Sequence, residues 1–171
     1  DTATLFFSED HFSQHENVDA FGILSNQNLV LSTSTSATLG GLSFEPGDLV
    51  EYDPNTDTAT LFFDGSLFSD AADIDAFYSL PDGTFLLSTS DSETLGGLSF
   101  RDGDIVLYNP LLDFATLFFS EDNFSQNENV DGISLFGDGS LLLTTSNSAT
   151  LGGLTFGDGD LVRYDPFLDL E

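Results

Sequence analysis

Residues 47–63 read GDLVEYDPNTDTATLFF, and this stretch decides the fold. It holds two short runs rich in β-branched and aromatic residues, at 48–53 and 58–63, separated by a Pro-Asn-Thr-Asp turn. In the first run, side chains suited to a core alternate with side chains suited to solvent, which is the period of a half-buried strand. The stretch therefore predicts two antiparallel strands joined by a tight turn.

The stretch recurs because the whole chain is one unit written three times. The copies occupy residues 1–56, 57–112 and 113–168. The first and third copies are identical at 35 of 56 positions, so each copy must form the same supersecondary unit. A unit of this length cannot bury its own apolar face, and we expect it to stack on its neighbours.

Four β-rich runs are expected in each copy, separated by Gly, Pro, Asn, Asp and Ser clusters. In the first copy they lie at residues 2–7, 18–24, 29–35 and 48–53. Short turns follow the second and fourth runs, whereas long connections follow the first and third. Because connections alternate between the two ends of an up-and-down sheet, both long connections should lie at the same end, where binding sites usually form.

The run GDLVEYDP…DTATLFF, followed by VDAF…LVLSTS, resembles the tandem blade repeats of bacterial secreted and surface proteins with β-propellers. The resemblance implies an all-β propeller with three four-stranded blades per chain, TATLFF outermost and VDAFGIL innermost. Two other three-fold folds, the β-trefoil and the β-prism, stay open as alternatives. Since propellers have about 4–8 blades, three blades predict half of a six-bladed ring. We expect a homodimer in which each N-terminal strand completes the last blade of the other chain.

The charge is strongly one-sided, with 30 acidic side chains against two basic ones and a net charge of −28. Such a chain repels nucleic acid and anionic lipid, so we expect no nucleic-acid partner. No stretch has the length of a membrane span, and there is no cysteine for a disulfide. These features favour an extracellular or cell-surface location. Residues 169–171 are expected to be the start of a further repeat followed by a cloning scar, so the chain is expected to be a segment of a longer repeat protein.

One candidate site repeats in every copy at the start of the innermost strand. Its residues are Asp19, Asp75 and Asp131. In a closed ring these carboxylates would form a collar at one mouth of the channel, and clustered oxygen ligands suit Ca²⁺. The alternative is that each carboxylate accepts hydrogen bonds from backbone N–H groups of the next blade and holds the ring together.

A second candidate is the acidic connection after the first strand. Its carboxylates are Glu9, Asp10 and Glu16 in the first copy and Glu121, Asp122 and Glu128 in the third. The second copy lacks the pattern, and no EF-hand-like run is present. Either the connection holds Ca²⁺ or its charges are simply solvated.

Three functions fit these observations. The leading one is a non-enzymatic binding or structural module, with Ca²⁺ as its cofactor. A carbohydrate-binding lectin would need exposed aromatic platforms, for which the candidates are Phe12, Phe68, Phe124 and Tyr78. A propeller hydrolase or lactonase would need acidic residues unique to one copy that converge on a channel metal. The nearly unchanged TLGGLSF segment, at 38–44 in the first copy, is expected to be a loop whose paired glycines have positive φ or admit a close approach of backbone. Its apolar side chains are expected to pack on the blade, the alternative being an exposed apolar rim.

Overall fold

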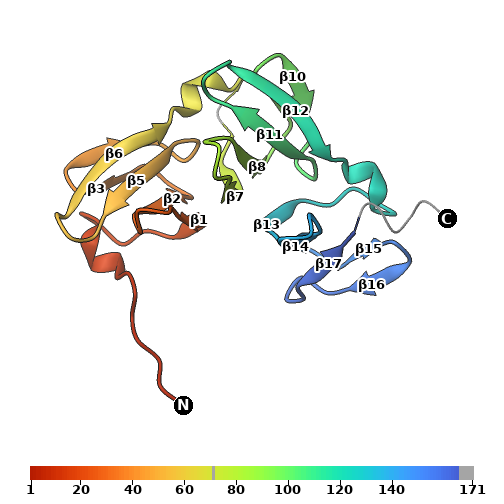
Figure 1. Ribbon diagram of the computed structural model, residues 1–171, viewed down its shortest axis with the longest axis horizontal. Coiled ribbons are helices and arrows are strands. Elements are labelled where there is room, and N and C mark those ends of the chain that lie inside the picture. The colour runs from red at the N-terminus through yellow and green to blue at the C-terminus, as the bar shows by residue number, and fades with distance from the viewer. Residues whose placement is uncertain (71, 166–171) are drawn as a thin grey trace.

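The fold of this chain is all-β and repeats with the sequence (Figure 1). A computed structural model describes residues 1–70 and 72–165, so the prediction made for 169–171 lies outside the described residues. The first unit contains β1 (Val18–Ile23), β2 (Leu29–Thr33), β3 (Ala37–Leu39), β4 (Leu42–Phe44), β5 (Leu49–Asp53) and β6 (Thr58–Phe63). The second contains β7 (Ile74–Ser79), β8 (Phe85–Thr89), β9 (Glu93–Leu95), β10 (Leu98–Phe100), β11 (Ile105–Asn109) and β12 (Phe114–Phe119). The third contains β13 (Val130–Leu135), β14 (Leu141–Thr145), β15 (Ala149–Leu151), β16 (Leu154–Phe156) and β17 (Val162–Tyr164). Single 3₁₀ turns precede the innermost strands: η1 (Glu9–His11), η2 (Gly65–Leu67) and η3 (Glu121–Asn123).

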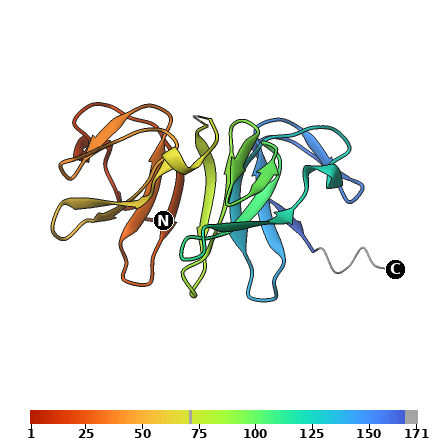
Figure 2. The ribbon, with the colours of Figure 1, turned by 90° about the horizontal axis from the view of Figure 1, so that it is seen from above.

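Three antiparallel sheets form the blades. Blade 1 has the order β1-β2-β5-β6, blade 2 the order β7-β8-β11-β12, and blade 3 the order β13-β14-β17. The innermost strands β1, β7 and β13 stand side by side around one axis, and the sheets spread outward from them (Figures 1 and 2). This propeller-like arrangement confirms the strand order predicted from the sequence, and it differs from a β-trefoil or a β-prism.

Each complete blade takes its outer strand from the following repeat. β6 and β12 are the TATLFF-type runs that open the second and third copies, and they pair with β5 and β11. Residues 2–7, which were expected to form a strand by pairing with a second chain, are not in a strand in the single chain. Residues 2–6 instead lead away from blade 1 (Figure 1).

The TLGGLSF segment forms a hairpin and not the irregular loop expected from the sequence. β3 and β4 pair in register, as do β9 with β10 and β15 with β16. Gly40 and Gly41 have φ of 54° and 84°, and two successive left-handed residues make the tight turn that suits twisted antiparallel strands. Leu39 and Phe44 are buried, so the predicted packing of this segment onto the blade is confirmed.

The apolar core lies between the blades. One cluster joins blade 1 side chains such as Val30 and Leu49 to blade 2 side chains such as Phe77 and Phe85. A second cluster joins blade 2 to blade 3 in the same way. The middle strand β2 is buried at all five of its residues, because it is covered on both faces. Within the described residues, no helix is long and apolar enough to cross a membrane.

Candidate functional site

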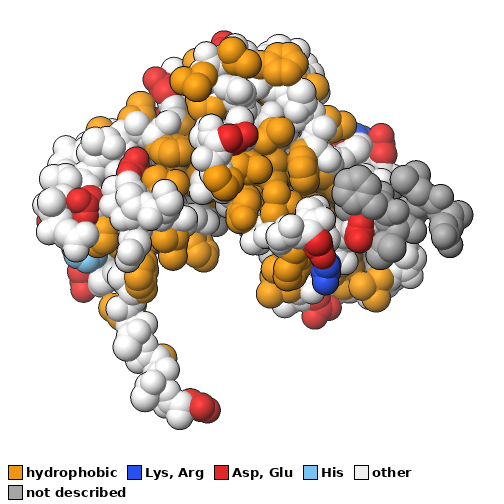
Figure 3. Space-filling view, in the orientation of Figure 1, with side chains coloured by type: hydrophobic (Ala, Val, Ile, Leu, Met, Phe, Trp, Pro, Cys, Tyr) orange, Lys and Arg blue, Asp and Glu red, His pale blue; other side chains and the backbone are white. Residues whose placement is uncertain are grey.

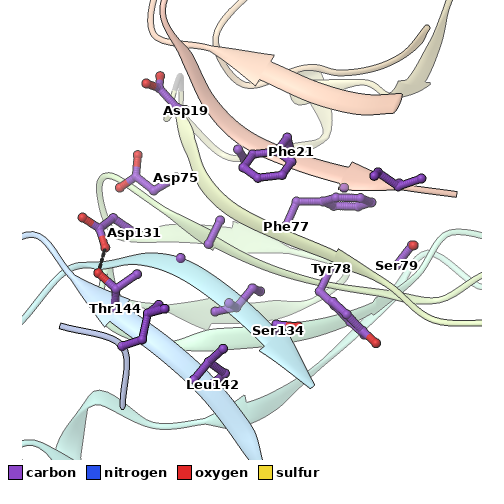
Figure 4. Close-up of a pocket in the computed structure, with 17 residues that line it drawn as sticks. Asp19, Phe21, Asp75, Phe77, Tyr78, Ser79, Asp131, Ser134, Leu142 and Thr144 are labelled. Atoms are coloured by element: carbon purple, nitrogen blue, oxygen red, sulfur yellow. Dashed lines mark hydrogen bonds between the residues drawn. The ribbon is translucent and has the colours of Figure 1, made fainter. Parts of the chain in front are cut away.

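The three innermost strands line a hollow of about 510 Å³ that opens along the axis of the blades (Figure 4). Its wall is largely apolar and includes Phe21, Ile23, Phe77 and Ile133. Apolar side chains cover much of the concave surface in the space-filling view (Figure 3). Asp19, Asp75 and Asp131 lie together at one mouth of the hollow (Figure 4). The structure thus brings the three repeated carboxylates to one place.

Local sequence explains why these carboxylates reach the mouth. Each stands at the second position of an innermost strand, where the ladder with the neighbouring strand is interrupted by a register shift. The irregularity falls between Val18 and Phe21 in β1 and at the matching place in β7 and β13. A bulge of this kind re-aims the side chains beside it.

Every one of the three carboxylates already accepts a hydrogen bond from the protein. The Asn129 side chain of blade 3 donates to Asp75 of blade 2 at 2.7 Å. The Asn17 side chain donates to Asp19 at 2.9 Å, and the Thr144 hydroxyl donates to Asp131 at 3.0 Å. The Asp75 bond joins two blades, as the structural alternative from the sequence predicts, although its donor is a side-chain amide and not a backbone N–H.

Asp73 is a fourth carboxyl at this mouth, and the sequence analysis missed it. It stands where the other copies have Asn17 and Asn129, and it hydrogen-bonds to Asp19 of the preceding blade. Burial above all, together with the hydrogen bond and the negative charge of Asp19, raises the pKa of Asp73 to about 8. The pair can form only if one carboxyl carries a proton. The departure from Asn in one copy was the available signal.

The other carboxyls at the mouth feel the same environment. Burial raises the pKa of Asp75 to about 6, with smaller contributions from the charges of Asp19 and Asp131, while the Asn129 hydrogen bond lowers it. Burial also raises the pKa of Asp19 above its ordinary value. The mouth therefore holds crowded, partly desolvated carboxyls. Within the described part of the chain, no group of three or more His, Asp or Glu side chains is arranged to hold a metal ion.

The acidic connection does not form a comparable cluster. Glu9 pairs with His15 at 3.3 Å, and Asp10 accepts a hydrogen bond from Ser8. Glu16 accepts hydrogen bonds from Gln14 and Thr35. These contacts spread the three carboxylates along the connection and leave each with its own partner.

In the third copy the same connection faces the neighbouring blade. Glu121 and Glu128 are buried, so the alternative of simply solvated charge is wrong for them. Arg101 of blade 2 lies 3.1 Å from Glu121 and 2.9 Å from Asp122. Burial raises the pKa of Glu121, and the Arg101 charge opposes that rise. These residues seal an interface between blades, a role that a single repeat does not reveal.

The aromatic candidates for sugar binding are not platforms. Phe12, Phe68 and Phe124 are buried, each with 6–7% of its surface exposed. Phe124 packs edge-on against Phe119, and Phe68 packs in the same way against Phe63. Tyr78 is half-buried on the wall of the hollow. The expectation of exposed aromatic residues in the connections is therefore wrong for the three phenylalanines.

The chain matches no protein family model and no curated protein. It is similar to the extracellular domain of the putative hybrid two-component system BT3049 from B. thetaiotaomicron, with 15% identity and a TM-score of 0.41 over 86% of this chain and 17% of that one. It is also similar to virginiamycin B lyase from Staphylococcus aureus, with 10% identity and a TM-score of 0.43 over 90% and 42% of the two chains. YCF48 bound to D1 peptide gives 8% identity and a TM-score of 0.36 over 95% and 56%. The chain thus spans less than two thirds of each of these proteins, and likenesses of this size assign it neither an activity nor a ligand.

Proposed function

We propose that this chain is a non-enzymatic β-propeller module of a bacterial secreted or surface protein, and that its working form is a six-bladed ring made by two copies. The observation that carries the proposal is the use of the repeated polar residues. Two of the three repeated carboxylates make contacts from blade to blade: Asp75 accepts from the Asn129 amide at 2.7 Å, and Asp19 hydrogen-bonds to Asp73. Repeated polar residues that hold the blades together are more typical of a rigid scaffold for binding than of an asymmetric catalytic centre.

The proposal places the ligand site at the acidic mouth of the hollow, with Ca²⁺ as the ligand. Supporting this choice, the carboxyls there raise one another's pKa values, because desolvated like charges cannot all ionise without a counter-ion. A divalent cation bound by their oxygens would relieve that repulsion. In a six-bladed ring, six equivalent Asp carboxylates would face it.

The test compares the chain with the triple variant D19N/D75N/D131N, because asparagine keeps the size and removes the charge. We expect calorimetry to detect Ca²⁺ binding by the original chain and to detect none by the variant. Exposed Asp82 provides the control, because it lies in the turn after β7, at the opposite end of this strand from Asp75, and D82N should leave binding unchanged.

Thermal melts of the same proteins separate the two roles of the carboxylates. A variant that loses Ca²⁺ binding and melts normally in the absence of calcium would show a ligand site. A variant that melts lower, from an original chain that never bound Ca²⁺, would show a purely structural role, since carboxylates accept stronger hydrogen bonds than amides. Unchanged calcium binding in the triple variant would contradict the proposed site.

A further inference from the structure

Blade 3 has an open outer edge, and the chain carries a segment that fits it. Within the described residues, β17 pairs with β14 alone, whereas β5 and β11 each have an outer strand as well. Residues 2–6 have the same TATLF sequence as residues 58–62 of β6 but make no strand. We infer that the outer edge of β17 binds residues 2–6 of a second copy, so that two chains exchange these segments and close one ring. This inference rests on the propeller architecture of the proposed function but on none of its ligands.

The register of the exchanged strand follows from the two complete blades. Thr60 lies opposite Glu51 in blade 1, and Thr116 lies opposite Leu107 in blade 2. The equivalent positions in blade 3 and the N-terminal segment are Arg163 and Thr4 of the second copy. The same shift places Leu5 of the second copy, which is 81% exposed here, opposite buried Val162. The new strand would thus cover apolar surface in the alternation already used twice.

The space beside the hairpin glycines shows where the outer strand of blade 3 would lie. A Cβ added to Gly40 would lie 2.5 Å from the backbone N of Ala59 in β6, and one added to Gly96 would lie 2.6 Å from the N of Ala115 in β12. At Gly152, the matching residue of blade 3, an added Cβ meets nothing within 4 Å. The glycine is present here although no backbone of the described residues lies beside it. In the exchanged dimer, Ala3 of the second copy would take that position.

The innermost strand of blade 1 also has an uncovered surface, on the side where a preceding blade would pack. Phe77 of β7 is 3% exposed because it packs against Gly22 of the preceding blade, where an added Cβ would lie 2.9 Å from the phenyl ring. Phe21 occupies the same position in β1 and is 68% exposed. Phe21 is more exposed than Phe77 because no blade of the described chain precedes blade 1. Blade 3 of the second copy would cover Phe21.

A side-chain hydroxyl at one repeated position bonds to the next blade in blades 1 and 2, and the same position in blade 3 has no following blade in this chain's described residues. Ser32 donates to the Ile74 carbonyl of the next blade at 2.9 Å, and Ser88 donates to the Val130 carbonyl at 2.6 Å. Thr144 is the equivalent residue of blade 3, and its hydroxyl instead donates to Asp131 of its own blade. In the dimer, Thr144 would donate to the carbonyl of Val18 of the second copy.

A second set of contacts repeats the pattern. Asp48 accepts a hydrogen bond from the Gly65 N–H of the next repeat at 2.7 Å, and Asp104 accepts one from the Glu121 N–H at 2.8 Å. Asp160 is the equivalent carboxylate of blade 3. Like Asp48 and Asp104 it accepts from a backbone N–H of its own turn, but the described residues give it no donor from a following repeat. The N–H of Glu9 of the second copy would complete the series. The two open surfaces of one chain are therefore complementary to each other.

The chain's own N-terminal segment is a poor candidate for its own open edge. Phe7 packs edge-on against Tyr52 of blade 1 at 5.5 Å, as Phe63 packs against Tyr108 of blade 2 at 5.6 Å. Residue 7 is thereby fixed to blade 1, and residues 2–6 start from there. β17 lies on the far side of the hollow from this point (Figure 1). A second copy, rotated about the axis of the blades, could keep its own Phe7 packed on its own blade 1 and still place its residues 2–6 along β17 of the first chain.

Cross-linking through engineered cysteines tests the exchange, since the chain has no cysteine of its own. Thr4 and Arg163 are both exposed, and directly opposed residues of antiparallel strands lie close enough to be bridged. The variant T4C/R163C should yield, after oxidation, a covalent species of twice the 18.4 kDa chain mass on a non-reducing gel. The variant E51C/T60C, in the same register inside blade 1, should cross-link within one chain. The variant T4C/L112C should not give this cross-linked dimer, because Leu112 lies in the turn between β11 and β12 of blade 2 and not on the edge of β17.

Light scattering on the original chain and on a variant lacking residues 1–6 completes the test. We expect a dimer for the original chain and loss of the dimer for the shortened chain, whose circular dichroism spectrum should still be that of a folded β protein, with less strand signal by the one strand that each chain has lost. A monomeric original chain, a shortened chain that stays dimeric, a T4C/R163C bridge within one chain, or an open ladder of multimers would each overturn the inference. None of these readouts involves calcium, so they stand apart from the test of the ligand site.

Discussion

At the scale of single residues, Asp73 is the position where the three copies differ with most effect. Asn129 donates to Asp75 with its amide, whereas Asp73 can donate to Asp19 only while it is protonated. The pKa of Asp73 is about 8 in the folded chain against 3.8 for an ordinary Asp. A group whose pKa is raised by folding stabilises the fold below its unfolded pKa, and this contribution is lost as the pH rises through the folded pKa. The melting temperature should therefore fall between about pH 4 and pH 8.

The variant D73N installs the asparagine of the other copies. We expect it to raise the free energy of unfolding at pH 8 by about 1 kcal/mol, because a neutral donor replaces a carboxyl that repels Asp19. It should also flatten the fall in melting temperature between pH 4 and pH 8, as measured by calorimetry. The reverse change N129D, at the Asp75 contact, should destabilise the chain and steepen the fall. A D73N variant that melts lower at pH 8 would contradict this account.

At the scale of elements, the hairpins make the outer strand specific. Gly96 and Gly152 have nearly equal φ values of 53° and 55°, so alanine would suffer the same backbone strain at both. Of these two glycines, only Gly96 has a neighbouring strand among the described residues, and its hairpin also accepts a hydrogen bond from Ala115. In the proposed dimer, the hairpin of blade 3 would contact a strand that the other chain supplies.

Alanine substitutions in the turn of blade 3 should separate strain from contact. The variant G152A should weaken dimerisation by about tenfold relative to G153A, because the added methyl group would meet the exchanged strand at a cost of about 1.4 kcal/mol. Gly153 has a similarly positive φ of 78° and no neighbour within 4 Å, so G153A carries the strain alone. Sedimentation at several concentrations would measure both dissociation constants. Equal constants would argue against a strand at this place.

At the scale of the whole molecule, charge works against assembly. The chain carries −28, and Arg101 and Arg163 both already pair with carboxylates, at the blade 2–blade 3 interface and at Asp138. Two such chains must approach closely to share blades. Their repulsion is long-ranged at low ionic strength and is screened within about 10 Å at 0.1 M salt. Stability and dimerisation should both depend on salt.

We expect the melting temperature to rise by about 3 °C between 20 mM and 500 mM NaCl, which corresponds to about 1 kcal/mol for a domain of this size. Scanning calorimetry at fixed protein concentration measures it, and choline chloride at equal ionic strength is the control for a sodium-specific effect. A melting temperature that stays constant or falls would mean that self-repulsion does not limit the fold.

The sequence predicts the blades well because their strands follow a simple alternation in each copy. The repeat, the order from VDAFGI to TATLFF, and the mouth formed by Asp19, Asp75 and Asp131 could all be read from it. β3 and β4 could not, because they have three residues each and gain their order by packing under β6. The burial of Glu121 could not be read either, since it depends on Arg101, which lies 20 positions earlier in a different repeat. The sequence of a single repeat therefore does not predict the contacts between repeats.

The offset between the repeat and the blade has a consequence for how such arrays grow. Each 56-residue unit begins with the outer strand of one blade and ends before the outer strand of the next. Duplication of this unit within a gene therefore adds one blade. The added unit contacts its two neighbours in the same way as the existing units contact each other. If the proposed exchange occurs, a run of whole units has two complementary ends, like those of a DNA fragment cut with an overhang, and the contacts that join neighbouring units within a chain would also join separate chains.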